Sequence, residues 1–222
     1  MTVCGVGTVW VLMPDEAARL RREYAELERE KVELAKAIDR LTGEDRVAEV
    51  HVIEQLPPEH PGGRPVTRIE FIELDRDGHP LPARQFTIDD DVIFFDALVI
   101  KFDPEHVAAG DKLRGKSLAM FRRIYGEHQN PAEGALIDPT GEVPGRYRGA
   151  PEANAYERKL WARFWDYATC PEEAAKEGVR VAHGEAVYVP MREGQVWTLT
   201  LQNNGGLSIK LRRPASPKLQ DA

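Results

Sequence analysis

The residues best able to do chemistry are four acids near the middle of the chain. Asp89, Asp90 and Asp91 stand in a row, and Asp96 follows them inside an otherwise apolar run. A carboxylate in such a run must sit at a bulge, pair with a buried donor or bind a cation, because burying it unpaired costs several kcal/mol. The pattern is compatible with a divalent-ion site or a general base, and more simply with a solvated turn beside a hydrogen-bonded Asp96. We therefore assign no catalytic, metal or cofactor-binding residue here.

The acidic turn Asp75-Arg76-Asp77-Gly78 invites comparison with a calcium-binding loop. That loop requires a glycine at its sixth position and a bidentate glutamate at its twelfth, where this chain has Phe86. An Asp-Gly turn between two alternating segments, here 68–74 and 83–88, is typical of a β-hairpin. The sequence therefore predicts a hairpin turn at this place.

The cysteines and histidines give no positive support for a nucleophile or a metal site. Cys4 and Cys170 fit no zinc or disulfide spacing. Cys170 lies 13 residues before His183, but it abuts Pro171, and spacing places no orienting acid beside them. No HxH or HExxH pattern occurs, and the glycine pairs lack the helix and lysine of a phosphate loop. We expect no cofactor, and whether the protein is an enzyme stays open, with the balance toward a non-catalytic protein.

Composition limits the function classes further. The chain has 222 residues, of which 42% are hydrophobic, so it can bury a substantial core. Its net charge of −7 argues against a nucleic-acid partner, because neutralising phosphates requires a basic face. The composition is that of an ordinary globular protein, and we expect its partners to be proteins.

The element expected to organise the molecule is a long helix between Pro14 and Gly43. Its leucines recur every seventh residue, which places them at heptad position d and mostly apolar residues at position a. Pro14 suits a first helical turn and Gly43 a C-terminal cap, so we predict a coiled-coil helix over residues 14–43. The expected oligomerisation residues are Leu20, Tyr24, Leu27, Lys31, Leu34, Ile38 and Leu41.

Charged residues bear on the number and direction of the helices in this coiled coil. Lys31 is the polar residue of the seam, and it favours a dimer because its charge reaches solvent more easily there than in a larger bundle. A parallel pair would set Glu16 against Arg21, which is attractive. It would also set Glu23 against Glu28, which is repulsive, so the direction stays open. The alternative is that the apolar stripe packs on later helices of the same chain.

The segment before the helix, residues 2–13, contains no charged residue. A membrane-spanning helix needs about 20 apolar residues, so this segment is too short to span by itself. We treat residues 1–13 as a separate region. If an apolar run precedes this region, it would be the end of a membrane anchor. Otherwise it would form an N-terminal strand over Val9, Trp10 and Val11, or a loose tip. We favour membrane association through the N-terminus over a soluble cytoplasmic location.

Residues 44–213 show the alternation and turn signals of a β-rich domain. The run 89–103 is predicted to be a buried central strand, and Asn203-Asn204-Gly205-Gly206 a hairpin turn. Residues 154–168 are predicted to form an aromatic-rich helix packed on the sheet. A short basic amphipathic helix is predicted around Arg122, which raises membrane-surface binding as a weaker hypothesis.

These patterns predict an α+β fold: a coiled-coil helix, then a mainly antiparallel β sandwich or barrel with two or three packed helices, then a frayed tail at 214–222. We expect a non-catalytic homo-oligomeric scaffold or adaptor that presents its β-rich domain to other proteins. The opposing hypothesis is an enzyme, or a domain that binds a small ligand or a metal, with its site near Asp96 and the 126–152 loop.

Overall fold

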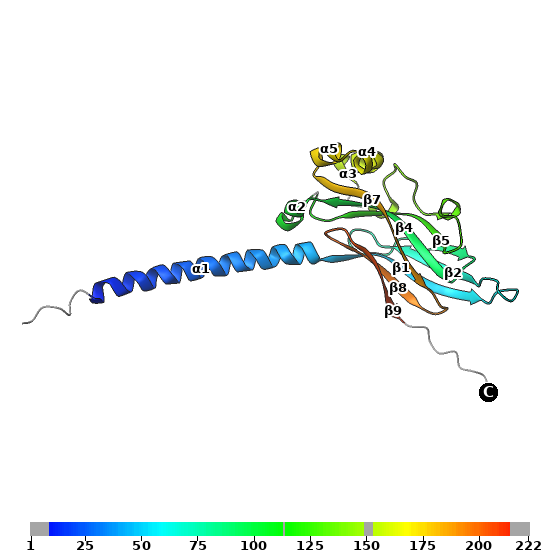
Figure 1. The fold of residues 1–222 in the computed structure, drawn as a ribbon, viewed down its shortest axis with the longest axis horizontal. Helices are drawn as coiled ribbons and strands as arrows, with labels where there is room; N and C mark the ends of the chain where they lie inside the picture. Colours follow the sequence, from blue (N-terminus) through cyan, green and yellow to red (C-terminus); the bar gives the residue numbers. More distant parts are fainter. Residues whose placement is uncertain (1–8, 113, 149–152, 214–222) are drawn as a thin grey trace, which may run out of the picture. The chain divides into compact units, whose positions relative to one another are not determined.

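The computed structural model describes residues 9–112, 114–148 and 153–213 (Figure 1). The fold is α+β, with one long N-terminal helix followed by two antiparallel sheets and short helices. Each sheet keeps two edge strands, so the barrel alternative is wrong. The chain divides into two compact units, Met1–Asp39 and Arg40–Ala222.

Helix α1 runs over Val9–Thr42 and contains 34 residues. Most of it consists of Ala, Leu, Glu, Arg and Lys, which are strong helix formers, and ion pairs such as Arg19 with Glu23 (3.0 Å) add local support. The helix begins before Pro14, which removes one backbone donor without ending it. Val9–Val11 are therefore helical, and the strand prediction for them is wrong; residues 1–8 lie outside the described residues. Within the described chain, no helix is both long and apolar enough to span a membrane.

The first sheet has the strand order β3-β2-β1-β8-β9, all antiparallel. The predicted hairpins β2–β3 and β8–β9 are confirmed, and in the second one Leu199 faces Ile209. Gly205 has φ 95° in the β8–β9 turn, a conformation that glycine adopts without strain. The strands are β1 (Glu44–Leu56), β2 (Val66–Glu73), β3 (Arg84–Ile88), β8 (Val196–Gln202) and β9 (Leu207–Arg213).

The second sheet has the order β6-β5-β4-β7. Strand β4 pairs on both sides and is buried along most of its length, as the run 89–103 predicted. Its strands are β4 (Val92–Phe102), β5 (Leu118–Gly126), β6 (Ala135–Leu136) and β7 (Val179–Pro190).

The structure corrects the predicted amphipathic helix around Arg122. This segment is strand β5, whose residues Leu118–Phe121 are all buried. Periodicity does not separate a short buried helix from a strand that is covered on both faces, and here pairing with β4 and β6 decides for the strand. The membrane-surface hypothesis, which required that helix, loses its basis.

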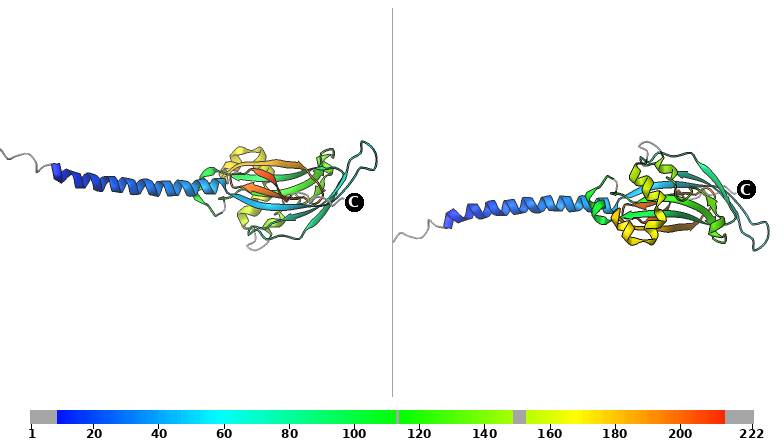
Figure 2. Two further views of the ribbon diagram at one scale, coloured as in Figure 1. Left: turned by 90° about the horizontal axis from the view of Figure 1, so that it is seen from below. Right: turned by 90° about the horizontal axis from the view of Figure 1, so that it is seen from above.

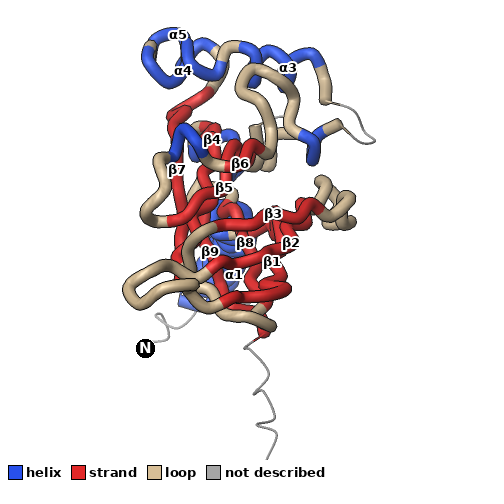
Figure 3. Tube along the Cα trace, turned by 90° about the vertical axis from the view of Figure 1, so that its right-hand side faces the viewer, coloured by secondary structure: helices blue, strands red, loops and turns tan. Residues whose placement is uncertain are grey.

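Short helices cover the second sheet on the side away from the first sheet (Figure 3). Seen from above, they lie across its strands (Figure 2). The predicted helix 154–168 is present but divides at Arg163, where ψ is 21°. The helices are α2 (Pro104–Ala109), α3 (Ala155–Ala162), α4 (Phe164–Thr169) and α5 (Pro171–Lys176), with 3₁₀ turns η1 (Pro131–Glu133) and η2 (Gly145–Tyr147).

Two apolar clusters hold the second unit together. The first contains residues from both sheets, with Phe71 centred 5.9 Å from Phe95 and 5.2 Å from Phe121. The second lies between the other face of β4, β5 and β7 and the short helices, with Trp161 and Phe164 fully buried. Strand β4 contributes to both clusters, which explains its continuous apolar sequence.

Candidate functional site

The predicted oligomerisation residues of the first unit lie on an exposed face of α1. More than half of each large apolar side chain is exposed, from 57% for Leu34 to 73% for Tyr24. Lys31 is exposed, and its ammonium lies 3.5 Å from the carboxylate of Glu28. A shallow apolar groove follows the seam, lined by Leu27, Glu30, Lys31, Leu34, Ala35 and Ile38.

Leu41 differs from the other predicted seam residues. It belongs to the second unit, is partly buried, and packs against the apolar cluster between the second sheet and the short helices. The last d position of the heptad pattern therefore serves the core of its own chain.

The carboxylate of Asp96 has an arginine partner. On β5, Arg122 donates from Nε and Nη2 to Oδ2 of Asp96, at 2.8 and 2.5 Å. Only 8% of the Asp96 side chain is exposed, so the ion pair compensates a buried charge. This geometry favours a structural role for Asp96.

The neighbouring acid Asp90 ties two turns together. Its carboxylate accepts hydrogen bonds from the backbone N–H groups of Asp91 and His128, at 3.0 Å each. Burial raises the pKa of Asp90, but these bonds and the contact with the His128 ring outweigh it and hold the pKa below its ordinary value. Asp90 thus acts as an anchor for the turn that follows β5.

The turn after β2 places Asp75, Asp77 and His79 close enough to share a cation. The Asp75 carboxylate already accepts the backbone N–H groups of Asp77 and His79, at 2.9 and 2.8 Å. These bonds lower the pKa of Asp75. Its geometry is that of a side chain that organises the turn between β2 and β3.

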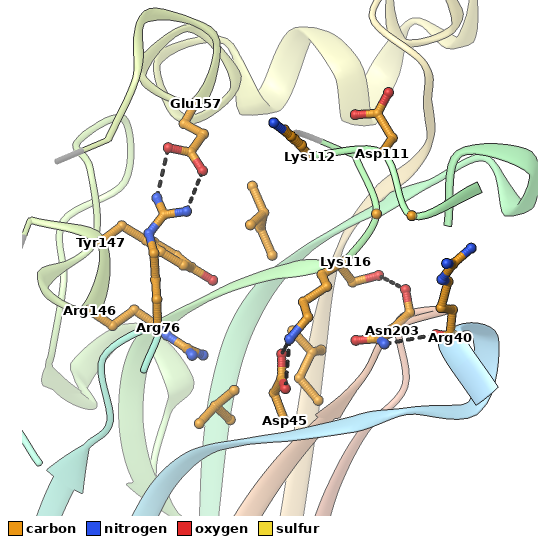
Figure 4. Close-up of a pocket in the computed structure, with 16 residues that line it drawn as sticks. Arg40, Asp45, Arg76, Asp111, Lys112, Lys116, Arg146, Tyr147, Glu157 and Asn203 are labelled. Carbon is orange, nitrogen blue, oxygen red and sulfur yellow. Dashed lines mark hydrogen bonds and ion pairs between the residues drawn. The ribbon is translucent and has the colours of Figure 1, made fainter. Parts of the chain in front are cut away.

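A cavity of about 370 Å³ lies in the second unit (Figure 4). Val47, Leu118 and Leu201 provide an apolar part of its wall. The rest of the wall is strongly charged and comes from the end of α1, β1, the turn after β2, the loop after α2, η2 and α3. Its volume falls in the range of small-molecule sites.

Two cations of the cavity wall have carboxylate partners. Arg76 forms a bidentate pair with Glu157, with both nitrogen–oxygen distances 2.7 Å. Glu157 is buried, and it also closes the capping box of α3 with Asn154. Lys116 lies 2.9 and 3.0 Å from the two oxygens of Asp45. Both pairs leave little net charge for a ligand.

Two tight backbone positions shape the loop beside these residues. Gly110 ends α2 with φ 67°, and a Cβ on Gly110 would lie 3.2 Å from Nε of Arg40. A Cβ on Gly115 would lie 2.4 Å from the carbonyl oxygen of Asp111. Glycine at position 110 leaves room for Arg40, which lines the cavity and donates to the carbonyl of Ala108 at 2.7 Å.

Arg146 is the most unusual residue of this wall. Only 5% of it is exposed, and its guanidinium lies over the ring of Tyr147 at 5.1 Å from the centroid. Its Nε and Nη1 atoms are buried without a hydrogen-bond partner among the described residues. Figure 4 shows the guanidinium turned toward the cavity beside Arg76. Buried guanidinium nitrogens without hydrogen-bond partners are rare, because their desolvation is uncompensated.

Two buried carboxylates lie beside Gly145, the residue before Arg146, and do not line the cavity. Glu73 is hydrogen-bonded by Arg84, and Asp138 accepts from the backbone N–H of Gly145 at 3.1 Å. Burial, and then the nearby charge of Asp138, raise the pKa of Glu73 to about 7, although Arg84 and Arg146 oppose the shift. Glu73 is therefore close to half-protonated near neutral pH.

Sequence reasoning found only part of this arrangement. The 126–152 loop, named in the ligand-binding alternative, does supply Arg146 and Tyr147, but Asp96 does not line the cavity. No sequence signal separated Arg146 from its near neighbour Arg148, because both stand in the same Gly- and Pro-rich stretch. No protein-family model, no curated protein and no solved structure matches this chain.

Proposed function

We propose that this protein is a non-catalytic, homo-oligomeric structural or adaptor protein. Helix α1 would form a coiled coil with α1 of a second copy, and the β-rich unit, a sandwich-type head, would be presented to protein partners. The observation that carries this proposal is the exposed face of α1, where Leu20, Leu27 and Leu34 are each 57 to 61% exposed.

The length and energetics of the helix support association. At 1.5 Å per residue, α1 is about 50 Å long. Complete burial of one leucine side chain is worth about 1.5 to 3 kcal/mol, and an isolated helix gains none of it. A second copy offers the same stripe over the same length, so knobs-into-holes packing can cover it.

The charges on the helix are compatible with a dimer. Lys31 sits at an a position and its ammonium already reaches the surface carboxylate of Glu28, so it can remain solvated beside a single partner helix. In a parallel dimer Glu23 and Glu28 would repel, whereas an antiparallel dimer would avoid that contact. Both directions remain alternatives within the proposal.

The test compares the wild-type chain with the double variant Leu27→Asp and Leu34→Asp by light scattering coupled to size-exclusion chromatography. We expect an oligomer, with a dimer favoured, for the wild type and a monomer for the variant, because two charges in the seam oppose its burial. The matched control is Ala25→Asp with Val32→Asp, which adds the same charge at b positions and should keep the wild-type mass. A wild-type monomer, or equal masses for wild type and the seam variant, would reject the coiled coil.

Membrane association is a second candidate, favoured by the helical conformation of Val9–Met13. An apolar segment that is helical and continuous with α1 is what the end of an anchor would require. Cell fractionation of the protein expressed from its native gene, with any upstream sequence included, tests it. Recovery in the soluble fraction alone would reject the anchor.

A further inference from the structure

The cavity of the second unit is lined by a buried arginine, two of whose nitrogens have no hydrogen-bond acceptor among the described residues. Only 5% of Arg146 is exposed, and two of its nitrogens have no acceptor among the described residues. Losing the hydration of a guanidinium without new hydrogen bonds is costly. A group that accepts from Arg146 would remove that cost.

Further positive charge faces the same cavity. Arg40 donates one N–H to the carbonyl of Ala108, and Lys112 is an exposed residue of the cavity wall. Neither has an ion pair with a carboxylate among the described residues, unlike Arg76 and Lys116. Three cations from three separate segments, none of them ion-paired among the described residues, therefore line one cavity.

We propose that this cavity binds a small organic molecule through an oxyanion group, a phosphate or a carboxylate, with Arg146 as the principal ligand. A planar guanidinium donates two parallel hydrogen bonds to either group, which makes it the preferred protein ligand for both. Arg40 and Lys112 add long-range attraction at the wall and the rim. The site is independent of the proposed coiled coil, since all its residues belong to the second unit.

The remainder of the wall indicates what the oxyanion is attached to. Val47, Leu118 and Leu201 give an apolar surface, and the Tyr147 ring already lies beneath Arg76 and Arg146. The cavity of about 370 Å³ is larger than an inorganic anion needs. An apolar or aromatic group on the ligand would fill the apolar part and add affinity.

The charges near Arg146 that lie outside the cavity wall are compatible with this binding near neutral pH. Glu73 and Asp138 do not line the cavity, and Arg84 is bonded to Glu73. Because the pKa of Glu73 is about 7, this carboxyl is only partly ionised and cancels only part of the charge on Arg146. The guanidinium therefore keeps attraction for a ligand anion.

The experiment is isothermal titration calorimetry of the full chain with phenyl phosphate, benzoate, inorganic phosphate and phenol. We expect phenyl phosphate or benzoate to bind, inorganic phosphate to bind more weakly, and phenol not to bind. The tighter of the first two identifies the oxyanion. In the Arg146→Met variant we expect the dissociation constant to rise at least about tenfold, because a charge-assisted bidentate contact is lost.

The matched control is Arg148→Met, which removes the same charge from an exposed residue next to the site and should leave the affinity unchanged. If Arg146→Met fails to fold, Lys112→Met replaces it, with an expected rise of about threefold from loss of an exposed cation. Equal affinity in the wild type and a folded Arg146→Met variant would overturn the proposal. Absence of heat from both organic anions at about 10 mM, the weak limit of specific binding, would overturn it as well.

Discussion

Arg122 and Arg146 are two arginines of the same β-rich unit, and they differ in the hydrogen-bond acceptors around them. Arg122 makes two short contacts with the buried carboxylate of Asp96. Arg146 is more deeply buried, yet two of its nitrogens have no acceptor among the described residues. Arg122 stabilises the fold by compensating the charge of Asp96, whereas the charge of Arg146 is left for the ligand that we propose.

Backbone pairing explains the difference. Arg122 and Asp96 stand on adjacent antiparallel strands, at the bulge where Asp96 faces Arg123 and Ala97 faces Phe121. The sheet fixes their separation, so the ion pair forms with little further ordering. Arg146 stands on a 3₁₀ turn within a long connection, where its position follows from Pro144 and Gly145 and from packing on Tyr147.

The largest effect is expected when the ion pair between Arg122 and Asp96 is broken. Arg122→Met leaves the Asp96 carboxylate buried without its cation, and we expect a loss of about 3 to 4 kcal/mol in the free energy of unfolding. Urea denaturation at neutral pH measures it. The control Arg123→Met, on the same strand but bonded only to carbonyl groups, should cost about 1 kcal/mol. Equal losses would mean that Asp96 does not depend on Arg122.

A somewhat smaller effect concerns Glu73. Its pKa is about 7 in the folded protein, against an ordinary value of 4.5, so the folded state holds the proton more tightly. Stability from this group is therefore complete below about pH 4.5 and is lost as the pH rises toward 7. We expect the wild type to lose about 2 kcal/mol between pH 5 and 7 relative to Glu73→Gln, by urea denaturation. Parallel pH profiles would show that Glu73 titrates normally.

Two leucines of α1 extend this comparison, because one packs against the core of its own chain and the other is exposed. Leu41 packs on the second apolar cluster, whereas Leu34 is 57% exposed. We expect Leu41→Ala to lower the stability of the β-rich unit by about 1 to 2 kcal/mol, because the site is partly buried. Leu34→Ala should leave that unit unchanged and weaken only self-association. Thermal unfolding of both variants, followed in the near-ultraviolet, makes the comparison.

The smallest effect is expected for an exposed pair in the cavity wall. Lys116 and Asp45 are paired, but their side chains are 60% and 44% exposed. Solvent screens such a pair, so Lys116→Met should cost no more than about 0.5 kcal/mol in urea denaturation. A loss as large as that of Arg122→Met would show that burial is not what separates the two kinds of pair.

Local sequence patterns were enough to predict the helix and the hairpins. The seven-residue repeat identified α1, and alternation with Asn-Gly and Asp-Gly turns identified the hairpins, because these patterns depend on backbone geometry over a few residues. The sequence also required that Asp96 have a partner, since a carboxylate in a buried strand must be compensated.

The contacts between residues distant in sequence follow from the tertiary structure. The apolar stretch around Arg122 fits a helix or a strand until β4 and β6 pair with it. Arg146 and Arg148 are equivalent in sequence, but packing on Tyr147 buries the first and leaves the second exposed. Long-range contacts set burial, and burial sets whether a charge is solvated, compensated or left able to bind a ligand.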